Sequence, residues 1–128
     1  MTETVRPPKT VQLLAQARSS DRERQVYERQ IGPADPGPTI HLRAQAQTRY
    51  ELLEPKTGKA PEHVRAKRSG QDLEIYLDGS ETADFIIEAY YDEALVPTPQ
   101  DSLTGLSDSG RLLPYVIDEG LRPALTSL

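Results

Sequence analysis

The sequence contains no cysteine and no tryptophan, and only one methionine and one phenylalanine among its 128 residues. Without cysteine the chain forms no disulfides, offers no thiolate nucleophile and builds no cysteine-ligated metal site. The lack of disulfides does not fix a compartment, because secreted bacterial proteins frequently do without them.

Long apolar runs are also lacking. No run approaches the roughly 18 residues of a membrane-spanning helix, and residues 1–20 contain no apolar segment of signal-peptide length. If the chain is exported, we therefore expect another address, such as a C-terminal one that this segment does not contain. Apolar residues make up only 36% of the chain, which predicts one domain with a thin core.

Turn-forming residues, in contrast, are abundant. The chain has 11 prolines and 8 glycines, which favour many turns and argue against long helices. Charge is divided unevenly, since residues 1–68 carry a net charge of +5 and residues 69–128 carry −10. A basic face for nucleic acid is one interpretation. We favour another, in which oppositely charged halves fold together, because the basic residues are spread along strand-like segments.

The clearest strand pattern lies in residues 69–92, around which we expect the rest to be arranged. Leu73, Ile75 and Leu77 alternate with polar residues, which is typical of a strand with one buried face. A turn at residues 78–80 precedes residues 85–91, which are apolar on both faces. This pattern predicts a β-hairpin whose second member is a central strand.

The N-terminal third is less regular. Residues 1–9 include Pro7-Pro8 and are expected to form a flexible segment. Residues 11–15 alternate as a strand, and residues 23–31 form either its hairpin partner or a short helix. The polar turn between the two segments favours the hairpin. Residues 32–38, rich in proline and glycine, are expected to form a loop within the same domain.

Further strands are expected along the remaining chain. Residues 40–46 alternate strictly, residues 50–53 end at a Pro-Lys-Thr-Gly turn, and residues 64–67 turn at Ser69-Gly70 into residues 73–77. Across that last pair, Arg65 and Lys67 are expected to face Tyr76 or Glu74.

Near the C-terminus two short strands are expected about the turn at residues 108–110. They cover residues 103–106 and 112–117, and Pro114 predicts an edge strand or a bulge for the second. The sequence thus predicts an all-β fold of about seven to eight mostly antiparallel strands, either a single β-sandwich or a partly open barrel. We place this domain at residues 10–119, after the flexible segment 1–9 and before a C-terminal tail at 120–128.

No group of residues carries recognisable chemistry, so we assign no catalytic, cofactor-binding or metal-ligating residue and expect no enzyme and no cofactor. His41 and His63 lie on the polar phase of predicted strands and are interpreted as surface residues. An acidic cluster suits Ca²⁺ by residue type, but it lacks the spacing of known calcium loops and is interpreted as solvated. Its members are Asp72, Glu74, Asp78, Glu81 and Asp84.

Two surfaces stay open as binding candidates. Tyr90-Tyr91, with Tyr76 and Tyr115, offers aromatic rings for glycans or a partner strand, although we favour an arrangement in which alternate tyrosines pack at the edge of the core and their neighbours face solvent. The strands rich in Gln and Arg near residues 41–49 leave open a sheet edge that pairs with another chain.

Several segments resemble a known family. Residues 57–61 (TGKAP), 70–73 (GQDL) and 88–92 (EAYYD), followed by 106–110 (LSDSG) and Tyr115-Val116, carry the likeness over residues 49–119. In this order they resemble the N-terminal, prefix-like domain of large repeat-containing bacterial surface adhesins, the RTX-type and Bap-like proteins exported by type I secretion. The matching residues belong to turns and strands and form no catalytic signature.

The resemblance implies a non-enzymatic module of a cell-surface adhesin or biofilm-associated protein that acts in anchoring or retention and in protein–protein contacts. The implied partners are the outer-membrane secretion or retention machinery or other surface proteins, with no nucleic acid and no direct membrane insertion. The implied location is the cell surface or outer envelope, reached without an N-terminal signal peptide. No Ala-Ala-Gly occurs, so proteolytic release is not implied.

Alternatives remain open on sequence grounds. The chain is either a fragment of a larger adhesin or a stand-alone relative. The second functional hypothesis is a stand-alone β-sandwich that binds carbohydrate or another small ligand. If the family resemblance is misleading, the expected location is the cytoplasm.

Overall fold

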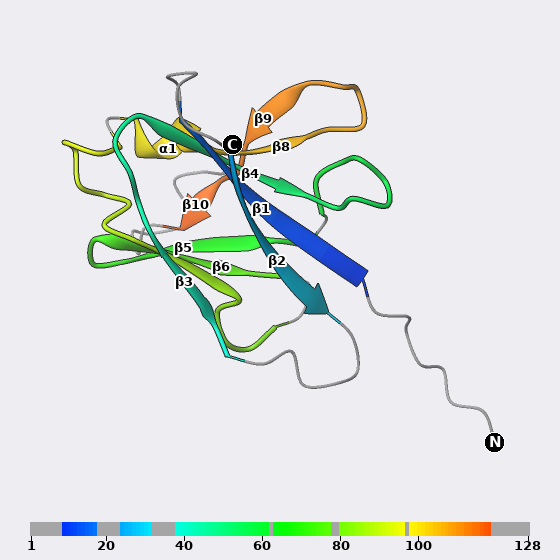
Figure 1. The fold of residues 1–128 in the computed structure, drawn as a ribbon, viewed down its shortest axis with the longest axis horizontal. Helices are drawn as coiled ribbons and strands as arrows, with labels where there is room; N and C mark the ends of the chain where they lie inside the picture. Colours follow the sequence, from blue (N-terminus) through cyan, green and yellow to red (C-terminus); the bar gives the residue numbers. More distant parts are fainter. Residues whose placement is uncertain are drawn as a thin grey trace.

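The fold consists of two stacked β-sheets (Figure 1). The computed structural model describes residues 9–17, 24–31, 38–61, 63–77, 80–96 and 98–118, without the side chains of Lys9 and Ile31. The strands in this part are β1 Lys9–Ala17, β2 Gln25–Ile31, β3 Ile40–Arg43, β4 Thr48–Leu53, β5 Arg65–Ser69, β6 Asp72–Tyr76, β7 Phe85–Glu88, β8 Leu103–Leu106, β9 Leu112–Pro114 and β10 Ile117–Asp118. A single helical turn, α1 Pro99–Ser102, precedes β8. No helix in this part of the chain is long and apolar enough to cross a membrane.

The sheets contain five strands each and do not close on one another. Sheet A has the order β2-β1-β4-β8-β9, and sheet B has the order β10-β5-β6-β7-β3. In Figure 1, β1 and β2 cross over β5 and β6. The predicted all-β fold is thus confirmed, and the two sheets, which are not closed into a barrel, are consistent with the β-sandwich.

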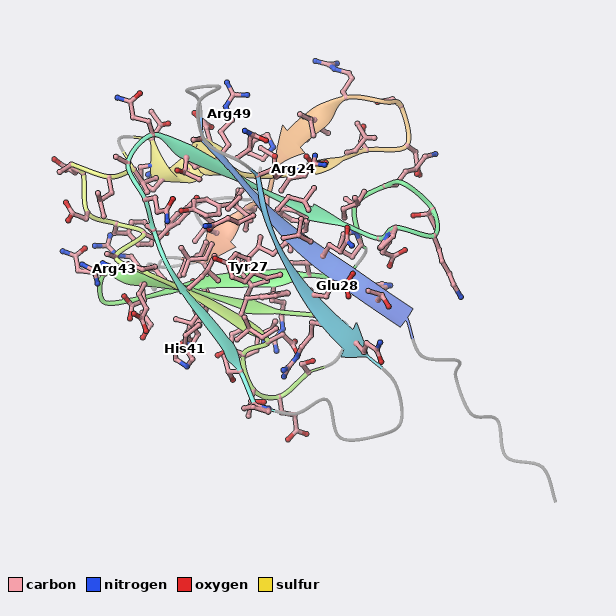
Figure 2. All side chains as sticks on the ribbon, in the orientation of Figure 1. Arg24, Tyr27, Glu28, His41, Arg43 and Arg49 are labelled. Carbon is pink, nitrogen blue, oxygen red and sulfur yellow. The ribbon has the colours of Figure 1, made fainter. Side chains whose placement is uncertain are left out.

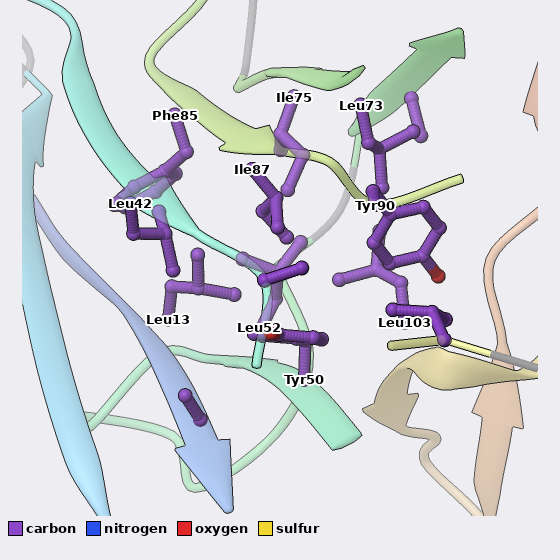
Figure 3. Packing of buried hydrophobic residues seen from close by; sticks show 14 of the residues in the cluster. Leu13, Leu42, Tyr50, Leu52, Leu73, Ile75, Phe85, Ile87, Tyr90 and Leu103 are labelled. Carbon is purple, nitrogen blue, oxygen red and sulfur yellow. The ribbon is translucent and has the colours of Figure 1, made fainter. Parts of the chain in front are cut away.

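The core fills the space between the sheets. Its largest fully buried side chains come from the predicted inward phases, among them Leu13 of β1, Leu52 of β4 and Ile75 of β6 (Figure 3). Phe85 and Ile87 of β7, in sheet B, and Leu103 of β8, in sheet A, belong to the same buried cluster. Because strand side chains alternate between faces, the period of two in the sequence predicts these core positions.

The predicted hairpins are present. β1 and β2 pair antiparallel, with Leu13 opposite Tyr27, so the strand prediction for residues 23–31 is confirmed over the helix. β5 and β6 pair with Arg65 opposite Tyr76 and Lys67 opposite Glu74, and β6 pairs with β7. Gly70 in the β5–β6 turn has φ +64°, a conformation that favours glycine.

Several details differ from the prediction. The described chain has ten strands, and three of the eight strand pairs are parallel: β3–β7, β4–β8 and β10–β5. These pairs join segments far apart in the sequence, which local patterns do not reveal. β7 lies in the interior of sheet B, but it is next to the edge strand β3 and is not the middle strand.

Strand ends also differ. The predicted strand at 40–46 ends at Arg43, since the chain turns at Ala46-Gln47, where Gln47 has φ 54°. The strand at 85–91 ends at Glu88, because Ala89 has φ 62° and starts a turn. Residues 112–117 divide between β9 in sheet A and β10 in sheet B. Lys9, the last residue of the predicted flexible segment 1–9, instead opens β1. The described residues do not include 1–8, the turns at 19–22 and 78–79, most of the loop at 32–38 or the tail at 120–128.

Candidate functional site

A buried ion pair joins the two sheets of the described chain. Arg29 of β2 and Asp84, just before β7, have side chains exposed by only 4% and 2%. Arg29 Nε donates to Asp84 Oδ1 at 3.0 Å, while the Leu77 N–H donates to Oδ2 at 2.8 Å. Arg29 Nη1 also donates to the Pro38 carbonyl. The pair therefore ties sheet A to sheet B, and both carboxylate oxygens have donors.

The sequence carries a signal for this pair on β2. Tyr27 and Arg29 share the inward phase of β2, while Val26, Glu28 and Gln30 are exposed. An arginine on the core-facing phase of a strand needs a buried acceptor. The acceptor, Asp84, was assigned to the solvated acidic cluster, and that assignment is wrong for this residue.

The remaining acidic cluster does not form a site. Asp72 Oδ1 accepts the Ala89 N–H at 3.0 Å, and Glu74 Oε1 accepts the Tyr76 hydroxyl at 2.8 Å. The hydrogen bond to Glu74 raises the pKa of Tyr76. Glu81 is exposed, and Asp78 lies outside the described residues. Among the residues that the structure describes, no group of three or more His, Asp or Glu side chains is arranged to hold a metal ion.

Both histidines lie at the surface, as predicted. His41 is on the outer face of β3, and its Nδ1 is 3.1 Å from Glu88 Oε2, with both side chains about half exposed. His63 is exposed and has φ 60°, in the connection between β4 and β5. His41 thus pairs with one surface carboxylate, and both positions agree with the interpretation of these histidines as surface residues.

The tyrosine pair is buried. Tyr90 is 0% exposed and Tyr91 is 8% exposed, and their rings meet edge-on at 5.2 Å between centroids. The Tyr90 hydroxyl donates to the Pro99 carbonyl at 2.5 Å, and burial raises the pKa of Tyr90 well above its ordinary value. Packing of a tyrosine against the core is therefore confirmed, but the predicted alternation of packed and solvent-facing neighbours is wrong at Tyr90-Tyr91, since both are buried, and so is their use as an exposed binding surface.

A second tyrosine site joins two of the family-like segments. The Tyr115 hydroxyl donates to the Pro61 carbonyl at 3.3 Å, and the Ala60 N–H donates to the Leu106 carbonyl at 2.9 Å. A Cβ added at Gly105 would lie 2.6 Å from Ala60 Cβ and 2.8 Å from the Tyr115 hydroxyl. Gly105 therefore allows residues 57–61 to pack against the segment around Tyr115.

The large apolar side chains that are exposed in the described residues lie on or next to edge strands. Leu112, Leu113 and Val116 are 51%, 47% and 83% exposed in and after β9, and Val26 of β2 is 48% exposed. β3 is an edge strand with His41 and Arg43 exposed on it (Figure 2), so the sheet edge expected near residues 41–49 is present at β3, whereas β4 lies in the interior of sheet A. The surfaces available for contact are thus sheet edges and their side chains.

Comparisons with protein-family models, with curated proteins and with solved structures identify no match for this chain. Its structural class is that of a two-sheet β-sandwich.

Proposed function

We propose that the chain is a non-enzymatic module of a bacterial cell-surface adhesin or biofilm-associated protein, acting in anchoring or retention and through protein–protein contacts. The observation that carries this proposal is the position of the family-like segments in the fold. Residues 57–61 and 106–110, with Tyr115, are in mutual contact at Gly105, and Tyr90-Tyr91 of residues 88–92 lie in the core. The resemblance thus rests on residues that have a structural reason to occur together.

The exposed sheet edges support a role in contacts between proteins. Edge strands offer backbone groups for pairing, and apolar side chains beside them add contact area. The proposed partners remain outer-membrane secretion or retention machinery or other surface proteins. The alternative of carbohydrate binding loses its basis at Tyr90-Tyr91, because both rings are buried.

Protease treatment of intact cells tests the proposed location. Cells that express the full native protein are treated with an external protease, and an antibody against this segment follows its cleavage, with a cytoplasmic protein as control. We expect cleavage in intact cells for an exposed module, or protection until the outer envelope is opened for a module retained there. Protection that ends only when the inner membrane is lysed would contradict the proposal.

A further inference from the structure

β2 is the longest edge strand of the described chain. It has seven residues and pairs only with β1, so its other backbone edge has no strand partner in the described part. The other edges are shorter, with four residues in β3, three in β9 and two in β10, and β9 contains Pro114. A long edge without proline is the part of a sheet most suited to pairing with another strand.

The outer face of β2 carries both charges and an apolar centre. Arg24, the residue directly before β2, and Val26 and Glu28 of β2 follow one another at every second position and are exposed, with Val26 48% exposed (Figure 2 labels Arg24, Tyr27 and Glu28). Glu28 Oε2 accepts a hydrogen bond from Gln12 Nε2 at 2.8 Å, which holds the carboxylate on this face. Arg29, on the opposite phase, is turned into the molecule toward Asp84.

This segment is complementary to itself when it is reversed. In an antiparallel pair, side chains directly opposite each other point to the same face. We propose that β2 pairs antiparallel with β2 of a second copy about a twofold axis at Val26. Arg24 of each copy then lies opposite Glu28 of the other, the two Val26 side chains meet, and Gln25 lies opposite Tyr27.

The neighbouring twofold registers fit less well. An axis at Tyr27 places Val26 opposite Glu28 and leaves Arg24 opposite Gln30, whereas an axis at Glu28 sets two carboxylates against each other. Like charges directly opposite destabilise strand pairs and disfavour the Glu28 register, and of the three registers only the one at Val26 sets opposite charges across the pair, so we assign that register. The result is an isologous dimer in which the two copies of sheet A form one continuous sheet.

The dimer is expected to be weak, because a pair of five-residue strands buries less than the roughly 1,200 Å² of a standard stable interface.

Sedimentation equilibrium up to roughly millimolar protein measures the association constant of the dimer. In the homodimer of either single variant, Arg24→Glu or Glu28→Arg, like charges lie opposite each other at both ends of the strand pair. We expect this repulsion to lower the association constant by about tenfold. An equimolar mixture of these two variants restores opposite charges at both ends and forms the heterodimer.

The matched control is Arg49→Glu, which reverses an exposed charge on the interior strand β4 and is expected to leave dimerisation unchanged. Circular dichroism checks that each variant is folded, and the double variant Arg24→Glu with Glu28→Arg dimerises like the natural sequence. A natural chain that stays monomeric at millimolar concentration would overturn the inference. So would a mixture of the single variants that associates no better than either variant alone.

Discussion

At the scale of single residues, Arg29 and Asp84 dominate the polar energetics of the described core. Breaking a buried pair leaves one charge without its partner, which costs about 3 kcal/mol or more. We therefore expect Asp84→Asn to lower the free energy of unfolding by about 3 kcal/mol in urea denaturation. Replacing Arg29 and Asp84 together by leucine is expected to cost less than the sum of the single replacements.

The control for this prediction is Asp108→Asn. Asp108 is 93% exposed and lies 3.6 Å from Lys59 Nζ, so we expect no measurable change in stability. If Asp84→Asn were as stable as the natural chain, the ion pair would not join the sheets as described.

Gly105 gives a second prediction at this scale. Gly105→Ala places a methyl group against Ala60 and Tyr115, whose nearest atoms are 2.6 and 2.8 Å from the added carbon. Overpacking of this kind costs about 2 kcal/mol of unfolding free energy. Ala60→Gly in the same chain removes one of the two close contacts, and we expect it to recover part of the loss in thermal unfolding. Full stability of Gly105→Ala would contradict the packing.

The buried tyrosines predict a dependence of stability on alkaline pH. Burial raises the pKa values of Tyr90 and Tyr115 above the 10.0 of a free tyrosine. Above pH 10 the folded chain therefore holds protons that the unfolded chain releases. The stabilising contribution of these two groups is present below that pH and is lost as the pH rises further.

Ultraviolet titration of tyrosinate should show Tyr90 and Tyr115 ionising only together with alkaline unfolding. Ionisation of all six tyrosines near pH 10 in the folded protein would disprove it.

At the scale of elements, β9 shows how an edge is protected. The Tyr115 N–H donates to Leu103 and the Arg111 carbonyl accepts from Ser107, so the alternation turns the nitrogen of Pro114 away from β8. Proline there costs no hydrogen bond within sheet A and removes a donor from its open edge.

We expect Pro114→Val to fold normally but to aggregate faster, as measured by light scattering at high concentration. Leu112→Val, on the same strand, is the control, and equal aggregation of the two would contradict this role.

The elements also show what the sequence can predict. Alternation located β1, β3, β6 and the core positions on them, because burial on one face of a strand imposes a period of two. It did not reveal the parallel pairs β3–β7 and β4–β8, since partners distant in sequence leave no local pattern. The early ends of β3 and β7 depend on Gln47 and Ala89 taking positive φ, which residues of these types rarely adopt.

Side-chain roles were harder to predict than strands. The surface position of His41 followed from the strand phase, whereas Tyr90-Tyr91 are both buried in a turn after β7, where strand phase does not apply. The Arg29–Asp84 pair did not, because it forms only when two sheets stack and bring residues 55 positions apart together.

At the scale of the whole molecule, some charges of the two halves meet across the fold. Arg29–Asp84 and Lys59–Asp108 each join a basic residue of the first half to an acidic residue of the second. Part of the uneven charge is thus paired within the sandwich, and the full sequence keeps a net charge of −5. This supports the interpretation that the basic residues serve the fold, in preference to a nucleic-acid surface.

The mass of the native protein that contains this segment tests the central proposal most directly. An antibody against residues 49–118 is used on envelope and soluble fractions after denaturing electrophoresis. A module of a large surface adhesin predicts a band far above 14.2 kDa in the envelope or the medium. A band near 14.2 kDa in the soluble cytoplasm alone would contradict the proposal and leave a small intracellular β-sandwich.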